Sequence, residues 1–219
     1  MDLNLLLVAF GSGIFGAAIG ALPAFIVFGL VLLIGVAISL ATGNNYFMNE
    51  IALGAFFGPH VFFGGSVAAC AYAGKKGLLN SGKDIMTPLI KVNKVNVLLI
   101  GGLFGILGYL INYSLTLLEI GVDTIAFSVV ISAIIVRYAF GKTGVFGRLD
   151  KFAERKSRPS NLWGRWIIEK SKISWLPWQN KFSTLLVLGL GVGLFSGWLS
   201  VLSKNALIGF GIAAVSLIF

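Results

Sequence analysis

Seven long apolar runs, separated by shorter polar stretches, constrain this chain more than any other feature. They fall at residues 4–22, 24–42, 50–74, 96–118, 122–140, 183–202 and 205–219. A helix needs about 20 apolar residues to cross a hydrocarbon core of about 30 Å. The runs are rich in Leu, Ile, Val and Phe and lack the alternation of barrel strands. The sequence therefore predicts an all-α polytopic membrane protein with about seven transmembrane helices, arranged as glycine-rich hairpins.

Composition favours lipid as the environment of these runs. Hydrophobic residues make up 57% of the chain and charged residues 11%, whereas an average soluble domain is about 25% charged. A soluble fold of 219 residues has too little interior to bury so much apolar surface. The last run, from Asn205, reaches only about 22 Å as a helix. We therefore expect either a shallow helix there or a sequence that continues beyond Phe219.

Positive charge is distributed unevenly, and the distribution predicts an orientation. The net charge is +9, and all of the 17 Lys and Arg except Lys204 lie in or beside the segments 75–95 and 141–182. Basic residues mark the cytoplasmic side of membrane proteins, which accounts for the charge without nucleic acid as a partner. We predict a multi-pass inner-membrane protein with its N-terminus outside and both basic segments in the cytoplasm.

The same segments divide the chain into four parts. Residues 1–95 form a first membrane unit, made of a hairpin and a third, broken or kinked helix. Residues 96–140 form a second membrane hairpin, and residues 141–182 form a basic cytoplasmic loop. Residues 183–219 form a third hairpin, which is expected to be incomplete.

A short glycine-aromatic pattern recurs at the start of each hairpin. It reads Gly13-Ile14-Phe15-Gly16, Gly102-Leu103-Phe104-Gly105 and Gly193-Leu194-Phe195-Ser196. The spacing indicates duplication of a unit of about 90 residues, although such a pattern is common in glycine-rich membrane helices. If the units are related, the first is inverted relative to the other two. Inverted repeats are typical of transporters with a site near the bilayer midplane.

The third run contains the single histidine of the chain in the sequence Gly58-Pro59-His60. Proline breaks or kinks a helix, and a carbonyl freed in lipid needs a new partner or a water-filled cavity. One interpretation is a short piece over residues 50–57, a break, and a half-helix over residues 59–73 whose positive end faces the membrane interior. The other is a kinked helix in which His60 bonds across a helix interface.

Further candidates for a polar path lie near this break or on a neighbouring run. Gly64, Gly65 and Ser66 follow His60 and either line the path or let helix backbones approach each other. Asn112 is an amide within the run 96–118. Glycines at four-residue spacing also occur at Gly16/Gly20, Gly101/Gly105 and Gly189/Gly193/Gly197. These favour helix packing over a pore wall and predict a homo-oligomer or a subunit of a membrane complex.

The loop 141–182 carries a Trp-rich amphipathic segment, PSNLWGRWIIEKSKISWLPW. Aromatic and basic side chains together suit a helix that lies in the headgroup layer of an anionic inner leaflet. The alternative is a helix packed against a partner subunit. The membrane-interface candidates are Trp163, Arg165, Trp166, Lys170, Lys172, Trp175 and Trp178. The bilayer, including anionic lipid, is therefore a predicted partner.

The sequence contains no pattern typical of catalysis or of a cofactor. His60 and Cys70 are the only residues of their types and do not form a metal site. The stretch GKTG at 141–144 lacks the spacing of a phosphate-binding loop. We expect neither an enzyme nor a bound metal or cofactor.

The resulting prediction is a channel or transporter for a small polar or ionic solute. Its path residues would be Gly58, Pro59, His60, Gly64, Gly65, Ser66 and Asn112. The alternative is a non-transporting structural subunit that docks a larger complex through its basic Trp-rich loop. A hydrated route to His60 distinguishes the first function, and a dry interior distinguishes the second.

Overall fold

The computed structural model describes residues 2–141 and 181–218, and helices account for all regular structure in these ranges. The Trp-rich segment and all its membrane-interface candidates lie outside the described residues. The elements are α1 (Leu3–Ile19), α2 (Ala21–Thr42), the π-helical turn η1 (Phe47–Ala52), α3 (Phe62–Lys75), the 3₁₀ turn η2 (Leu89–Val92), α4 (Val95–Leu117), α5 (Thr124–Phe140), α7 (Phe182–Ser203), α8 (Ala206–Val215) and the 3₁₀ turn η4 (Ser216–Ile218). Each apolar run thus contains helix, and the all-α prediction is confirmed.

Three of the described helices are long and apolar enough to cross a bilayer. They are α2 with 22 residues, α4 with 23 and α7 with 22. The helices α1, α5 and α8 are apolar but shorter. The chain is therefore a helical membrane protein, but the predicted number of about seven spans is not confirmed.

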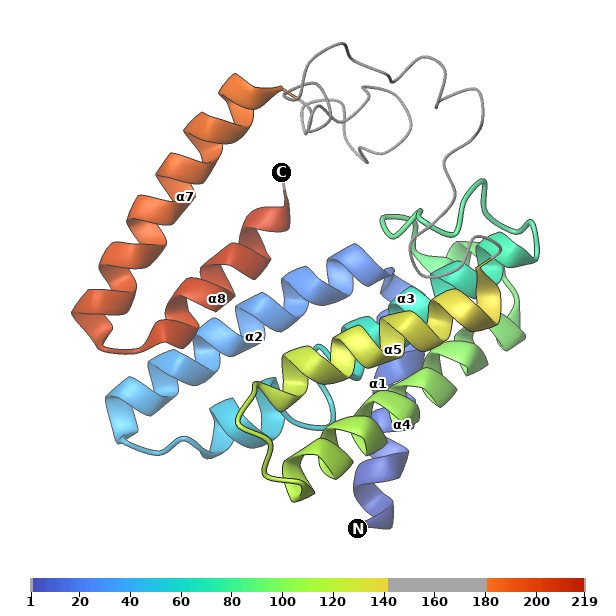
Figure 1. Ribbon diagram of the computed structural model, residues 1–219, viewed down its shortest axis with the longest axis horizontal. Helices are drawn as coiled ribbons and strands as arrows, with labels where there is room; N and C mark the ends of the chain where they lie inside the picture. The colour runs from blue at the N-terminus through green and yellow to red at the C-terminus, as the bar shows by residue number, and fades with distance from the viewer. Residues whose placement is uncertain (1, 142–180, 219) are drawn as a thin grey trace.

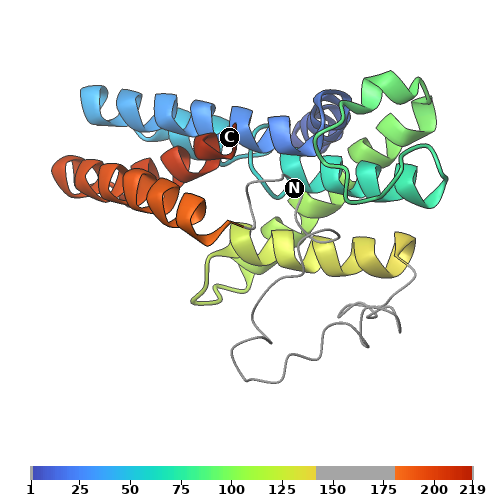
Figure 2. The ribbon, with the colours of Figure 1, turned by 90° about the horizontal axis from the view of Figure 1, so that it is seen from above.

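The short helix α3 lies at the centre of the molecule. It contacts α1, α2, α4 and α5, and Figure 2 shows α2 and α5 on opposite sides of it. Most of its 14 residues are buried, namely Phe62, Gly64, Gly65, Ser66, Ala68, Ala69, Cys70 and Ala73. All of them except Phe62 have small side chains, which lets the surrounding helices approach closely. Protein, not lipid, thus surrounds α3, and a membrane protein tolerates an interrupted helix under this condition.

The predicted hairpin of the first two helices is not confirmed. Figure 1 shows α1 and α2 diverging, and α1 packs chiefly against α4 and α3 while α2 packs chiefly against α8 and η1. The chain turns at Gly20, whose φ of +99° favours glycine. The Leu22 N–H donates to the Ile85 carbonyl at 2.9 Å. The loop after α3 therefore covers the corner between α1 and α2. By contrast, α4 packs on α5 and α7 packs on α8.

Glycines let α1, α3 and α4 meet backbone to backbone. A Cβ on Gly65 of α3 would lie 2.5 Å from the Gly101 carbonyl oxygen and 3.0 Å from the Gly13 Cα. A Cβ on Gly101 of α4 would lie 2.6 Å from the Gly13 carbonyl oxygen. The packing interpretation of Gly101 and Gly105 is confirmed, since Gly105 also lies against Gly13. We call this contact the glycine crossing.

The glycines of α7 have the opposite surroundings. An added Cβ would meet no atom of the described structure within 4 Å at Gly189, Gly191, Gly193 or Gly197. No described residue of α7 is buried, and the helix contacts α8. The close approach predicted for Gly189, Gly193 and Gly197 is therefore not formed within the described chain.

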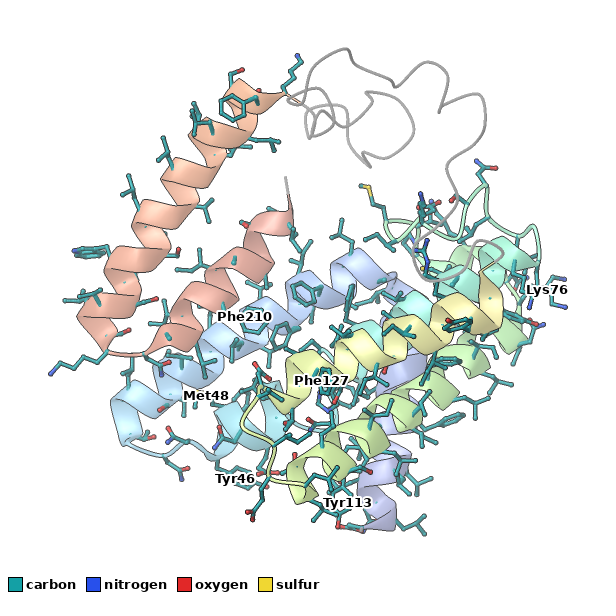
Figure 3. All side chains as sticks on the ribbon, in the orientation of Figure 1. Tyr46, Met48, Lys76, Tyr113, Phe127 and Phe210 are labelled. Carbon is teal, nitrogen blue, oxygen red and sulfur yellow. The ribbon has the colours of Figure 1, made fainter. Side chains whose placement is uncertain are left out.

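The helices run between two ends that differ in charge. The basic end carries Asp84 and the basic residues Lys75, Lys76, Lys83, Lys91, Lys94, Arg137 and Lys181. The acidic end carries Lys204 and the acidic residues Asp2, Glu50, Glu119 and Asp123. Figure 3 shows Lys76 at one end and Tyr46 and Tyr113 at the other. The Lys75 Nζ donates to the Ala139 carbonyl at 2.8 Å, which joins α3 to α5 at the basic end. The two predicted cytoplasmic segments thus begin at the same end of the molecule.

Candidate functional site

The third apolar run is interrupted at the predicted place but with different bounds. The turn η1 ends at Ala52, and α3 begins at Phe62 rather than at Pro59 and ends at Lys75. The cause is a tight turn that follows the proline. The Gly58 carbonyl accepts from the N–H groups of Val61 and Phe62, both at 2.9 Å, before the regular helix begins.

The interrupted segment, residues 53–61, folds closely onto itself. A Cβ on Gly58 would lie 2.6 Å from the His60 Cε1 and 2.7 Å from the Leu53 carbonyl oxygen. The Ser12 hydroxyl of α1 donates to the Phe56 carbonyl and so satisfies one backbone acceptor of the break. Gly58 is therefore required for the position of the His60 ring.

His60 lies beside the middle of a helix that is long enough to cross a bilayer. Its backbone carbonyl contacts Gly108, where any Cβ would collide with it. Gly108 stands near the centre of the 23-residue helix α4, which runs from Val95 to Leu117. The His60 side chain is only 1% exposed. The break thus places an imidazole deep inside the helical bundle.

A pocket of about 460 Å³ extends from His60 toward the acidic end. Its lining comes from α1, η1, the break, α4 and α5. The polar lining residues are Asn49, Glu50, His60, Tyr109, Asn112, Tyr113, Thr116 and Thr124, and the others are Leu5, Leu53, Gly54, Ala55 and Ile125. The structure therefore brings His60 and Asn112, which are far apart in sequence, to the walls of one cavity. We call this cavity the polar pocket.

Two buried atoms on these walls lack a hydrogen-bond partner within the described residues. They are the Nδ1 of His60 and the Oδ1 of Asn112. A buried polar atom left unpaired costs about 1–3 kcal/mol, so nearly all such atoms in proteins are paired with protein or ordered water. An imidazole nitrogen donates or accepts, and an amide oxygen accepts. The polar pocket thus offers hydrogen bonds to a guest molecule or to water.

A polar stripe on α4, which was not predicted as a set, supplies much of the lining. Tyr109, Asn112, Tyr113 and Thr116 follow the spacing i, i+3, i+4 and i+7, which places them on one helix face. The rings of Tyr109 and Tyr113 stack with their centroids 6.4 Å apart. A search for polar residues at helical spacing inside apolar runs would have found this face.

The remaining predicted path residues lie elsewhere. Gly64 lines a separate cavity of about 30 Å³ between α3 and α5, together with Ser132. Gly65 belongs to the glycine crossing. The Ser66 hydroxyl donates to the Phe62 carbonyl of its own helix at 2.6 Å. These three residues are not among those that line the polar pocket, whereas Gly58 positions the His60 ring behind it.

Comparisons with known proteins place the whole chain in one family. No match was found among curated proteins or among solved structures. The profile of one family covers residues 1–219. The chain therefore belongs to DUF7973, a family of unknown function.

Proposed function

We propose that this protein is a membrane channel or transporter for a small polar or ionic solute, and that the solute binds in the polar pocket. The observation that carries the proposal is the pair of unpaired buried atoms, His60 Nδ1 and Asn112 Oδ1, on the walls of one cavity. An intramembrane polar group without a partner is costly in lipid, so its retention favours a functional role.

The position of the pocket supports the same proposal. Transporters commonly bind solute near the bilayer midplane, at the break of a discontinuous helix. His60 lies in such a break and beside the middle of α4. The glycine crossing lies on the other side of Gly108 along α4, at Gly101 and Gly105, and seals α1, α3 and α4 together. A solute would therefore reach His60 from the acidic end in this conformation.

The lining indicates which solutes suit the pocket. Phenol, amide, hydroxyl and imidazole groups form hydrogen bonds with polar solutes of either charge or none. Glu50, which is exposed, adds one carboxylate to the lining. The volume of about 460 Å³ lies within the usual range for small-molecule sites.

The proposed orientation follows the charges. With the basic end in the cytoplasm, the N-terminus and the mouth of the polar pocket face outside the inner membrane. The alternative function, a structural subunit docked through its basic loop, depends on residues 142–180, which lie outside the described residues. It remains a prediction, and the polar pocket favours transport over the dry interior that this alternative requires.

Water access to the polar pocket is the first test. In a variant with Cys70→Ala as background, Ala55→Cys places a thiol on the pocket wall, and Ala68→Cys places one in α3 outside it. Both alanines are buried, so the pair differs in access to the pocket and not in exposure. A small impermeant methanethiosulfonate reagent should label Ala55→Cys from the acidic side and leave Ala68→Cys unlabelled.

Permeation is the second part of the test. Proteoliposomes are challenged with urea, glycerol and sodium formate, and volume changes are followed by light scattering. Asn112→Ala should alter permeation of at least one probe, whereas Asn96→Ala should not. Asn96 is a matched control because it lies at the start of α4 and bonds the Tyr72 hydroxyl at 3.1 Å. Unlabelled Ala55→Cys together with permeation no faster than in protein-free vesicles would overturn the proposal.

A further inference from the structure

The buried face of α5 carries hydroxyl groups although the helix is apolar. The buried residues of this helix are Ser128, Ser132 and Val136, which follow four-residue spacing and so share one face. Thr124 precedes Ser128 by the same spacing and lines the polar pocket. Three hydroxyl groups thus follow one another along α5 from the polar pocket inward. We call Thr124, Ser128 and Ser132 the hydroxyl row.

One member of the hydroxyl row lacks a hydrogen-bond partner within the described residues. The Ser132 Oγ is buried and unpaired, and its side chain is 2% exposed. The Ser128 hydroxyl, by contrast, donates to the Thr124 carbonyl at 2.6 Å. Ser132 lines the cavity of about 30 Å³ between α3 and α5, which is large enough for a water molecule. The unpaired hydroxyl therefore offers a hydrogen bond to a small guest molecule there.

This small cavity lies between the polar pocket and the basic end. On α5, Ile125 lines the polar pocket and Val129 lines the small cavity. Four residues of helix span about 6 Å, so about one turn separates the two cavities. Val67, Ala133 and Val136 line both the small cavity and a further cavity of about 540 Å³ at the basic end. Three cavities thus follow α5 from the acidic end to the basic end, with one closed turn between the first and the second.

The helix α3 is loosely packed where it faces these cavities. A Cβ on Gly64 would meet one described atom within 4 Å, the Pro59 carbonyl oxygen at 3.6 Å, which is an ordinary contact distance. A Cβ on the next residue, Gly65, would lie 2.5 Å from the Gly101 carbonyl oxygen in the glycine crossing. The side of α3 that has room for a passage is therefore the side that faces α5.

We infer that the solute path continues from the polar pocket along the hydroxyl row to the basic end, and that the solute is small and uncharged. This inference rests on the proposed transport function. Ser132 forms a hydrogen bond with the solute after the solute has left His60. The turn between Ile125 and Val129 is the closed part of the path in this conformation, and transport requires α3 and α5 to separate there.

The charges along the path favour an uncharged solute over an ion. None of the described residues that line the small cavity is charged, and an ion without water or a charged partner is strongly destabilised. The two ends also differ in sign, since Glu50 lines the polar pocket whereas Lys75 and Lys83 line the cavity at the basic end. A cation is favoured at the first and disfavoured at the second, and the reverse holds for an anion. A neutral molecule with hydrogen-bonding groups meets neither barrier.

Permeation into proteoliposomes of the full chain tests the inference. Urea and glycerol are the uncharged probes, and sodium formate is the ionic probe. Ser132→Ala should slow the uncharged probes about fivefold, as expected for the loss of one hydrogen bond. Ser114→Ala is the matched control, because Ser114 is exposed on α4 and is not among the residues that line the three cavities. It should leave permeation unchanged.

A second pair of variants narrows the path without disturbing the fold. Gly64→Ala adds a methyl group on the side of α3 that faces α5, at an ordinary contact distance, so the thermal unfolding midpoint should not fall. Permeation of urea and glycerol should nevertheless become slower. Gly11→Ala is the control, since Gly11 is exposed on α1 and no described atom lies within 4 Å of an added Cβ. It should change neither the midpoint nor permeation.

The outcomes distinguish this inference from the proposed function. If the wild type passes urea or glycerol and neither Ser132→Ala nor Gly64→Ala slows them, the path does not follow the hydroxyl row, and the proposed function stands. Formate that permeates as fast as the uncharged probes would likewise contradict the inference alone. Passage of neither uncharged probe would overturn the inference, and together with unlabelled Ala55→Cys and no passage of formate it would overturn the proposed function as well.

Discussion

Gly101 and Gly105 on α4 and Gly189, Gly193 and Gly197 on α7 share the same four-residue spacing, yet their surroundings are opposite. The α4 pair contacts the backbone of α1 and α3, whereas a Cβ on any of the α7 glycines would meet nothing within 4 Å of the described structure. Both helices are long and apolar enough to cross a bilayer. Neither glycine spacing nor hydropathy therefore decides whether a glycine face is in contact.

The difference arises from what the partner helices present. At the glycine crossing, three helices contribute glycines at one place, so their backbones touch. The neighbour of α7 is α8, and the closest contact of Gly209 is the Ser200 hydroxyl rather than a glycine. A glycine face forms a tight contact only where a second small-residue face meets it. The comparison can be tested by adding one methyl group at different places.

The largest loss of stability is expected for Gly65→Ala. The new Cβ would lie within 3.2 Å of three backbone atoms, on Gly101, Gly13 and Gly105. Backbone cannot move aside as a flexible side chain does, so overpacking should lower stability by about 1–3 kcal/mol or more. The measurement is the thermal unfolding midpoint in detergent. An unchanged midpoint would show that the three helices are not in backbone contact.

A smaller effect is expected for Gly102→Ala, one residue along α4 from the crossing. Its Cβ would lie 2.5 and 2.6 Å from two ring atoms of Phe10 and 3.1 Å from the Ile14 Cγ1, all of them side-chain atoms. A ring can shift, so the loss of stability should be smaller than for Gly65→Ala. The double variant with Phe10→Leu should recover part of it, because neighbouring sites couple. Absence of any coupling in the double-mutant cycle would contradict this account.

The smallest effect is expected for Gly193→Ala. No atom of the described residues lies within 4 Å of an added Cβ at this position, and the unfolded reference state in a membrane is already helical. The unfolding midpoint should therefore stay within error of the wild type. A loss as large as that of Gly65→Ala would mean that α7 has a close partner outside the described residues. Particle mass in detergent would then show whether that partner is a second copy of the chain.

Much of the fold was predictable because hydropathy fixes where helices form in lipid. The bounds of α2 and α4 lie within a few residues of the predicted runs 24–42 and 96–118. The break near Pro59 was predictable because proline cannot donate a backbone hydrogen bond. The start of α3 was not, because the turn closed by the Gly58 carbonyl is a detail of local geometry.

The candidate site was predictable in its chemistry but not in its assembly. His60 and Asn112 stood out as polar groups within apolar runs, and the structure places both on one cavity. Gly65 and Ser66 were predicted because they follow His60 closely in sequence. In the structure Gly65 belongs to the glycine crossing, and the Ser66 hydroxyl donates to the Phe62 carbonyl. Neighbours in a helix lie on different faces, and which face meets a cavity depends on α1 and α4. The predicted hairpin of the first two helices is not confirmed, because the helix against which each one packs is set by the tertiary structure.

The central position of α3 has a consequence for how the protein is made. This helix has 14 residues, too few to cross the hydrocarbon core alone, and it follows an irregular segment with polar backbone. Two of the helices that enclose it, α4 and α5, come later in the chain. During synthesis the third apolar run is therefore made before α4 and α5, two of the four helices that α3 contacts. We therefore predict that α3 reaches its final position only after α4 and α5 have entered the membrane, so that insertion does not proceed strictly one helix at a time.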